Sequence, residues 1–222
     1  MAIRARGLAF QMPFRAVAAA ASGCGKTYWV VRYLLEHHPG VPIVWVAPKY
    51  SLEQRALEAM RLALGPLWTQ VDASDGWTDA VREKIMARLQ HKARDQQLIL
   101  VIDDMMSADR RSKFVSMLYT TARHLGTSII ELSQRLFPPD KEARTQRLNC
   151  THYWLGRFAG GEREVSSLLQ QLEARDRARA IAEEYARLMD ADQFAHLIIT
   201  VGEPRDSPLR YRTELDQGLA FD

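Results

Sequence analysis

The stretch AAAASGCGKTYWVVRYLL, Ala18–Leu35, decides which fold the chain can adopt. It begins inside an apolar run, RAVAAAA at 15–21, which has the length of a buried strand and ends in a glycine-containing turn. The segment KTYWVVRYLLEHH at 26–38 follows with a helical pattern and stops before Pro39-Gly40. A strand, a short turn and a helix in direct succession predict one βα unit of a parallel α/β sheet.

The turn between this strand and this helix matches a phosphate-binding pattern at all positions but one. In that pattern, G-x-x-x-x-G-K-T/S, backbone N–H groups converge on an anion at the N-terminus of a helix. Gly25, Lys26 and Thr27 occupy their places, and Ala20 stands where the first glycine belongs. Alanine is tolerated there if its φ stays negative. We therefore expect a nucleotide-binding loop, and its predicted binding residues are Ser22, Gly23, Cys24, Gly25, Lys26, Thr27 and Tyr28.

Two side chains of this loop have separate expected roles. The Lys26 ammonium would reach the β- and γ-phosphates of ATP and act in catalysis, and the Thr27 hydroxyl would coordinate Mg²⁺. The alternative is a plain small-residue turn between strand and helix, in which Lys26 is solvated.

An acidic pair follows a second apolar run, LILVIDD at 98–104. Asp103 is expected to hold Mg²⁺ directly or through water, and Asp104 to orient or deprotonate the attacking water. A buried strand that ends in two carboxylates is common, so the pair gains its meaning from the phosphate loop upstream. A small-molecule kinase rarely needs the second carboxylate, because its substrate and not water is the nucleophile. Loop and pair together therefore favour an NTP hydrolase.

Strand-like and helix-like segments alternate along the rest of the chain, which predicts a mostly parallel sheet with helices on both faces. A charged helical region covers Glu162–Met189, with a break near 173–177, and Thr78 is a candidate N-cap. The remaining strands are expected at 41–47, 127–134, 152–158, 194–201 and 209–215, and the remaining helices at 78–97 and 109–126.

Composition sets broad limits on the function. The net charge of +3 permits an anionic partner but does not predict one. Cys24 and Cys150 are far apart and form no disulfide or metal-binding spacing, so we expect a reducing compartment. No apolar run resembles a secretory signal or reaches the ~18 residues of a membrane span. The sequence predicts a protein that is neither secreted nor membrane-spanning.

The segments RHLGTSIIELSQRLFPP and RTQRLNCTHYWLGRF, 123–139 and 144–158, carry a resemblance to a known family. Together with the two motifs above, they resemble the core of the FtsK/HerA superfamily of DNA-pumping ATPases. The likeness is greatest to the genome-packaging ATPases of tailless icosahedral viruses with an internal membrane. It covers roughly 14–158, and Ala20 departs from the family pattern. The matching elements, in the family order, are Asp103-Asp104, Arg123-His124, Gln134 and Arg147-Leu148-Asn149.

The resemblance implies a RecA-like P-loop NTPase fold, in which the loop is the Walker A motif and the acidic pair ends the Walker B strand. Gln134 would end a strand beside that strand and act as a sensor of the γ-phosphate and the water, although a solvated Gln at a strand end is the alternative. Arg147 would be an arginine finger in a neighbouring subunit's site. Arg123 and Arg144 are rival candidates.

The resemblance further implies an ATPase motor, with ATP and Mg²⁺, that drives double-stranded DNA into a viral capsid. It implies a homo-oligomeric ring, expected to be hexameric, that grips DNA through its phosphates whatever the base sequence. Viral capsid or membrane vertex proteins would dock the ring, and the protein would be found in the host cytoplasm or at the packaging vertex. The candidate gripping residues are Arg110, Arg111 and Lys113, for which plain solvated charges are the alternative.

We expect one ATPase domain over 1–222, with an N-terminal arm at 1–13, a core at 14–158 and closing helices and strands at 159–222. Two other functions stay open on the sequence. One is a cellular or plasmid translocase of the FtsK/HerA type. The other is a nucleotide-binding assembly protein with little turnover, which the alanine at position 20 keeps in consideration.

Overall fold

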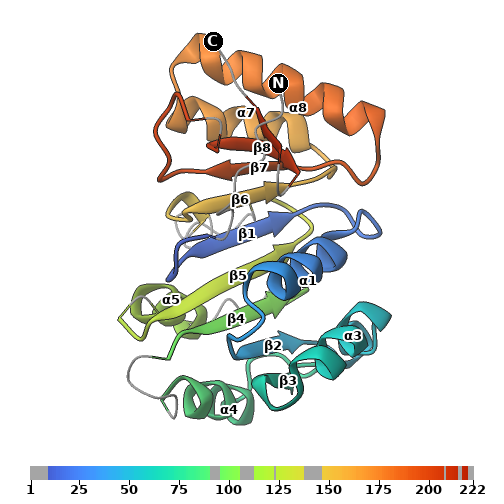
Figure 1. The fold of residues 1–222 in the computed structure, drawn as a ribbon, viewed down its shortest axis with the longest axis vertical. Coiled ribbons are helices and arrows are strands. Elements are labelled where there is room, and N and C mark those ends of the chain that lie inside the picture. The colour runs from blue at the N-terminus through green and yellow to red at the C-terminus, as the bar shows by residue number, and fades with distance from the viewer. Residues whose placement is uncertain are drawn as a thin grey trace. The chain divides into compact units, whose positions relative to one another are not determined.

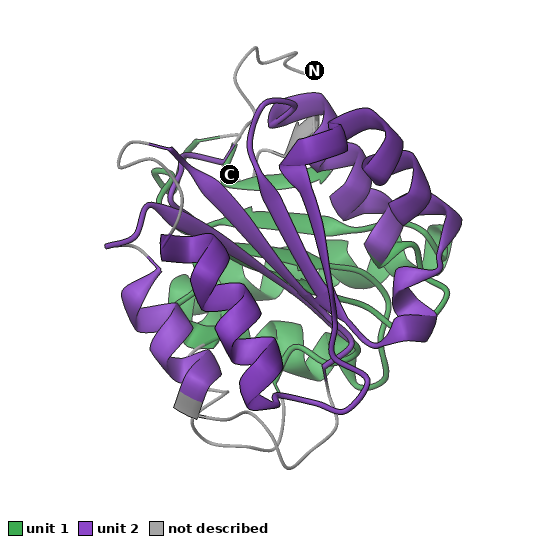
Figure 2. Ribbon diagram, turned by 90° about the horizontal axis from the view of Figure 1, so that it is seen from below, with its two compact units in different colours: residues 1–8, 16–26, 134–222 green, residues 9–15, 27–133 purple. Residues whose placement is uncertain are grey.

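The computed structural model describes residues 10–90, 96–105, 113–122, 124–137, 147–207, 209–214 and 217–219. The chain forms two compact units, coloured separately in Figure 2. Unit 1 contains the described residues of 16–26 and 134–222, and unit 2 contains those of 10–15 and 27–133. The expected single domain over 1–222 stays a prediction. The arm residues 1–9 and the arginines at 110, 111, 123 and 144 lie outside the described residues.

Unit 2 is built on four parallel strands in the order β3-β2-β4-β5. Every residue of β2 and β4, the two inner strands, is buried, which explains why their sequences are apolar on both faces. Figure 2 shows helices of unit 2 on both sides of its strands, as the sequence predicted. The strands are β2 (Ile43–Ala47), β3 (Trp68–Asp72), β4 (Leu98–Asp103) and β5 (Thr127–Ser133).

The helices of unit 2 follow their strands in sequence (Figure 1). Helix α4 begins where the sequence predicted, because the Thr78 hydroxyl accepts a hydrogen bond from the Val81 amide at 3.4 Å. Its residues Val81, Ile85 and Leu89 are buried at helical spacing. The helices are α1 (Lys26–His37, of which Lys26 belongs to unit 1), α2 (Lys49–Leu52), α3 (Arg55–Leu64), the 3₁₀ turn η1 (Gly65–Leu67), α4 (Asp79–Gln90) and α5 (Lys113–Thr121).

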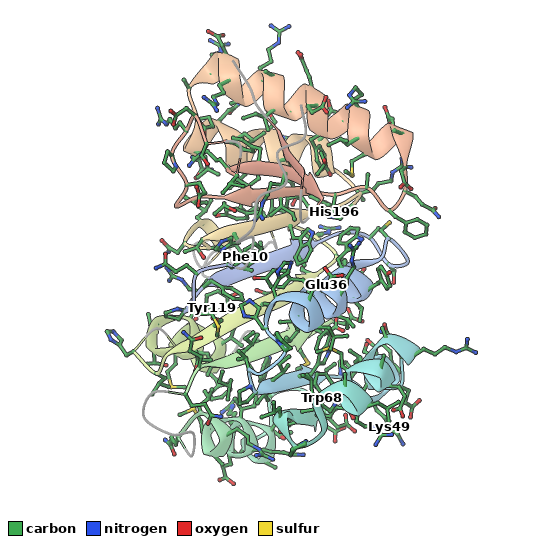
Figure 3. All side chains as sticks on the ribbon, viewed as in Figure 1. Phe10, Glu36, Lys49, Trp68, Tyr119 and His196 are labelled. Atoms are coloured by element: carbon green, nitrogen blue, oxygen red, sulfur yellow. The ribbon has the colours of Figure 1, made fainter. Side chains whose placement is uncertain are left out.

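Unit 1 combines one parallel strand pair with an antiparallel extension. β1 (Arg15–Ala19) runs parallel to β6 (His152–Leu155) from Ala16 onward. Beyond β6, the strands β7 (Leu197–Thr200), β8 (Tyr211–Glu214) and β9 (Gln217–Leu219) pair antiparallel, each with the next. His196, labelled in Figure 3, comes just before β7, and the centroid of its ring lies 5.8 Å from that of Trp154 in β6.

Two helices, α7 (Gly161–Leu172) and α8 (Arg175–Ala191), complete unit 1 and are separated where the sequence predicted a break. The buried carboxylate of Glu173 explains the break. Its Oε1 accepts hydrogen bonds from the Arg210 Nε and the Tyr211 hydroxyl, both at 2.6 Å, so the chain turns there to face the start of β8. Burial, more than this hydrogen bond, raises the pKa of Tyr211.

The segment 48–77 is where the sequence analysis assigned no element. It contains α2, α3, η1 and β3. The signal for α3 was present, since Leu57, Met60 and Leu64 recur at helical spacing and are buried. Within the described ranges, no helix is both long and apolar enough to cross a membrane.

Candidate nucleotide-binding site

The loop between β1 and α1 has the backbone that its glycines require. Gly23 has a φ of 79° and Gly25 a φ of 82°, both in the left-handed region that side chains disfavour. A Cβ placed on Gly23 would meet no atom within 4 Å, so backbone conformation and not space selects glycine there. The loop leads directly into α1, which begins at Lys26.

Ala20, at the position of the missing glycine, fits this loop. Among the non-glycine residues that the structure describes, Asp104 is the one with a positive φ, so the φ of Ala20 is negative. The Ala20 side chain is fully buried. The condition set by the sequence is therefore met, and the exchange of glycine for alanine leaves the loop conformation accessible.

The Lys26 side chain folds back over the loop that precedes it. Its Nζ donates hydrogen bonds to the carbonyl oxygens of Ala20 at 2.7 Å and Ala21 at 2.9 Å. The ammonium is thus not simply solvated, as the alternative interpretation required. It is held beside the loop by two neutral acceptors.

Residues after β6 fix the start of the loop. The Ala21 amide donates to the Arg157 carbonyl at 2.6 Å, and the Gly156 amide donates to the Ala19 carbonyl at 2.9 Å. The Tyr185 hydroxyl of α8 in turn donates to the Gly156 carbonyl at 2.8 Å. No local sequence pattern reveals a bond between residues so far apart.

The acidic pair lies at the carboxyl end of β4 in unit 2. Asp103 is the last residue of the strand and is 4% exposed. Asp104 follows with a φ of 52°, in the left-handed region that Asp tolerates better than most residues. Its Oδ2 accepts a hydrogen bond of 2.6 Å from the Tyr50 hydroxyl in α2. This bond is the main cause of a raised Tyr50 pKa. Sequence reasoning missed Tyr50, which lies in the unassigned segment.

Gln134 follows β5 directly and is exposed. β5, which is paired with β4, ends one residue earlier than the sequence predicted, at Ser133, and the sensor role of Gln134 stays a prediction. The next residues are held from two sides. Arg147 Nη1 donates to the carbonyls of Arg135 and Leu136, and the Phe137 amide donates to Glu164 Oε2 at 2.8 Å.

Arg147 is placed differently from the sequence prediction. Its side chain is 0% exposed and its guanidinium binds carbonyl oxygens of its own chain. An arginine finger has to reach out of its subunit, so this geometry favours a structural role for Arg147 over the predicted finger. The rivals Arg123 and Arg144 fall outside the described residues.

The predicted metal ligands, Thr27 and Asp103, both belong to unit 2. A hydroxyl and a carboxylate are the hard oxygen ligands that Mg²⁺ prefers, and nucleotide phosphates and waters usually supply the others. Within the described part of the chain, no three His, Cys, Asp or Glu side chains gather as a metal site. Next to Thr27, Tyr28 is 62% exposed.

The predicted site residues are divided between the units. The loop residues from Ser22 to Lys26 belong to unit 1, as do Gln134 and Arg147. Thr27, Tyr28 and the two carboxylates belong to unit 2. Contacts within each unit link Lys26 to its loop and Asp104 to α2.

Three solved structures resemble the chain in fold. The DNA-packaging ATPase B204 of Sulfolobus turreted icosahedral virus has a TM-score of 0.59 at 15% identity, over 86% of this chain and 94% of that one. The genome-packaging NTPase B204 of Sulfolobus turreted icosahedral virus 2, solved with ATP-γS, has a TM-score of 0.56 at 16% identity, over 85% of this chain and 92% of that one. VirB4 of Thermoanaerobacter pseudethanolicus has a TM-score of 0.56 at 12% identity, over 85% of this chain and 87% of that one. These likenesses confirm the predicted fold.

Sequence comparison gives the family. No curated protein sequence matches the chain. The family model described as "Poxvirus A32 protein" matches residues 77–201, more than half of the chain. That segment includes Asp103, Asp104, Gln134 and Arg147, whereas the phosphate loop precedes it. The chain therefore belongs to the Poxvirus A32 protein family and has the RecA-like fold of P-loop ATPases.

Proposed function

We propose that this protein is an ATP-hydrolysing motor that moves double-stranded DNA into a viral capsid. The observation that carries the proposal is the loop from Ser22 to Gly25, whose left-handed glycines and overlying Lys26 ammonium suit a phosphate site. Family membership supports the proposed motor function, and so does the fold shared with B204, which is described as a DNA-packaging ATPase.

In the proposed nucleotide complex, Lys26 exchanges its two carbonyl acceptors for β- and γ-phosphate oxygens. A charge-assisted bond to phosphate is stronger than a bond to a neutral carbonyl, so ATP competes well for the ammonium. Backbone amides at the start of α1 bind the phosphates, since the N-terminus of a helix favours anions. Thr27 and Asp103 would hold Mg²⁺, which neutralises phosphate charge when bound.

Asp104 is proposed to orient the attacking water and accept its proton, and Gln134 to sense the γ-phosphate. Because Arg147 is engaged inside its own chain, we assign the finger to another arginine, with Arg123 and Arg144 as candidates. Arg147 and Glu164 instead fix the backbone immediately after Gln134.

The motor forms a ring, proposed to be hexameric, around duplex DNA that it grips through phosphates. Arg110 and Arg111 lie outside the described residues and the side chain of Lys113 is not described, so their gripping role comes from the sequence alone. Capsid or membrane vertex proteins would dock the ring at the packaging vertex.

Turnover of ATP by the purified full chain, with and without duplex DNA, tests the proposal. We expect hydrolysis that DNA stimulates, and Lys26→Ala should lower kcat/KM by about 10²-fold or more, since electrostatic stabilisation of the transferred phosphoryl group is lost. Arg32→Ala is the matched control, because Arg32 is an exposed cation of α1 paired with Glu36. Hydrolysis unchanged by Lys26→Ala would contradict the proposal.

A nucleotide-binding assembly protein is the second candidate. The satisfied state of Lys26, already bonded to Ala20 and Ala21, is the observation that favours it, because ATP has to displace these bonds. Tight ATP binding without turnover, measured by calorimetry on the same preparation, would select this function over the motor.

A further inference from the structure

The hydroxyl of Tyr50 donates a short hydrogen bond, of 2.6 Å, to the carboxylate of Asp104. The Tyr50 side chain is nevertheless 65% exposed. An exposed tyrosine is usually free to rotate, so a well-formed bond to one particular carboxylate calls for a structural cause.

Strand register provides the first part of that cause. β2 and β4 are neighbouring parallel strands, with Val46 opposite Ile102. Their carboxyl ends therefore lie side by side, and the residues that follow each strand meet at the same edge. Tyr50 comes three residues after β2, in α2, and Asp104 comes directly after β4.

A chain of hydrogen bonds from β3 fixes the short helix that carries Tyr50. The Lys49 amide donates to the Ser74 hydroxyl at 2.9 Å, and that hydroxyl donates to Asp72 Oδ1 at 2.6 Å. The Ser74 amide donates to the same carboxylate oxygen at 2.9 Å. These two bonds lower the pKa of Asp72. The end of the next strand thus holds α2 through a contact separate from the one to Asp104.

The backbone of Asp104 is the second part of the structural cause of this hydrogen bond. Its left-handed backbone, at a φ of 52°, is sparsely populated by residues other than glycine. Such conformations persist where surrounding contacts determine them, and they concentrate at functional sites. The Tyr50 hydroxyl is one such contact, since it holds the carboxylate of the turned residue.

We propose that Tyr50 is a positioning residue for Asp104. The Tyr50 phenol fixes the rotation of the Asp104 carboxylate, which acts on the attacking water. This role rests on the proposed ATP hydrolysis. The Tyr50 hydroxyl donates a hydrogen bond to Asp104 and transfers no proton to or from the substrate. The bond to a charged acceptor is charge-assisted, and it raises the pKa of Tyr50 because it favours the protonated phenol. A base held in one rotamer spends more of its time in the reactive orientation.

The test compares Tyr50→Phe with wild type in steady-state hydrolysis by the full chain. General-base catalysis contributes about 10²–10⁴-fold, and loss of orientation removes part of it, so kcat should fall by roughly tenfold. KM for ATP should change by less than about twofold, since an interaction that acts only in the transition state leaves ground-state binding intact. Tyr119→Phe is the matched control, because it removes a tyrosine–carboxylate bond of 3.1 Å, to Glu131, from the same unit (Tyr119 is labelled in Figure 3).

A double-mutant cycle separates positioning from general damage. In an Asp104→Asn background, Tyr50→Phe should have no further effect on kcat, because the group it positions is already lost. Equal kcat values for Tyr50→Phe and Tyr119→Phe would overturn the role, as would additive effects in the cycle.

A spectroscopic readout detects the contact without turnover. In protein labelled with 3-fluorotyrosine, the ¹⁹F resonance assigned through Tyr50→Phe should shift on Asp104→Asn, while that of Tyr119 stays in place. An unmoved Tyr50 resonance would overturn the proposal. Absence of hydrolysis by wild type would overturn the proposed function, and this role with it. Wild-type hydrolysis that Tyr50→Phe leaves unchanged would overturn the positioning role alone.

Discussion

Arg147 shows how a charged residue can serve the site without contacting nucleotide. It is completely enclosed, and its guanidinium binds the two carbonyls that follow Gln134 along the chain. Its own carbonyl accepts a bond of 2.8 Å from the Tyr153 hydroxyl in β6. Without the Arg147 guanidinium, these two carbonyls would lose their hydrogen-bond donor, at the cost of their desolvation. Arg147 therefore holds the backbone that follows the proposed sensor, Gln134, in one conformation.

Arg147→Lys should therefore act inside its own subunit. The shorter lysine side chain would not carry its ammonium to the position that Nη1 occupies, and we expect the free energy of unfolding to fall by about 1–3 kcal/mol in urea titrations. When variant and wild-type subunits are mixed, ATP turnover should decline in proportion to the variant fraction. Arg32→Lys, at an exposed pair with Glu36, should change neither quantity. A decline much steeper than proportional would restore the finger assignment.

The contacts of Arg147 and Tyr50 could not be predicted from the sequence. Each joins residues whose approach depends on strand register: Tyr50 to Asp104 across β2 and β4, and Arg147 to the segment after β5. The loop residues, by contrast, follow one another along the chain, and their spacing alone determines which amides and glycines lie together. The sequence therefore revealed the loop and the acidic pair but not the residues that hold them.

At the scale of elements, apolar runs explain most of what was predicted. β2, β4 and β5 are buried nearly throughout. In the sequence β2 is apolar at every position, β4 is apolar up to Asp103, and β5 has an apolar centre at Ile129-Ile130. β3 has the sequence WTQVD, with only Trp68 and Val71 well buried, and this weaker pattern gave no prediction. An outer strand of a sheet is covered less, so its composition carries less signal.

β6 begins at a buried histidine that couples this element to pH. Burial, helped by the nearby charge of Arg212, lowers the pKa of His152 from 6.5 to about 3. The native state thus keeps the imidazole neutral while the unfolded chain binds a proton below pH 6.5. The unfolded state then holds more protons, so stability falls as pH drops through this range and is fully present above it.

We expect the free energy of unfolding to decrease between pH 6.5 and pH 5 by up to about 1.4 kcal/mol per pH unit from His152. Urea titrations at several pH values measure it. His152→Gln removes the titrating ring and retains a polar partner for Thr151, which bonds His152 Nδ1 at 2.8 Å. The variant should show a flatter dependence on pH. His38, whose pKa burial lowers to about 4, should leave a residual slope. Identical slopes in variant and wild type would contradict the assignment.

At the scale of the whole molecule, the phosphate loop and the acidic pair lie in different units of one chain. The family match begins at residue 77 and includes the acidic strand, whereas the loop lies upstream of it. Two independent kinds of observation therefore support the proposed ATPase: a sequence family for one part and a local backbone geometry for the other.

The proposed partner leads to a prediction that involves the complete assembly. A motor that grips duplex DNA through phosphates displaces counterions, so the logarithm of its apparent affinity should fall linearly with the logarithm of salt concentration. The slope is about −0.9 per phosphate contacted, and six contacts would weaken binding by roughly 10³-fold between 50 and 200 mM salt. DNA-stimulated ATP turnover at increasing salt measures this, and the basal rate without DNA serves as its control. Two duplexes of unrelated sequence should give the same curve, because phosphates carry no base information. Stimulation that resists salt would contradict a grip through phosphates. Stimulation that differs more than about tenfold between the duplexes would show base recognition and contradict a motor that moves along any sequence.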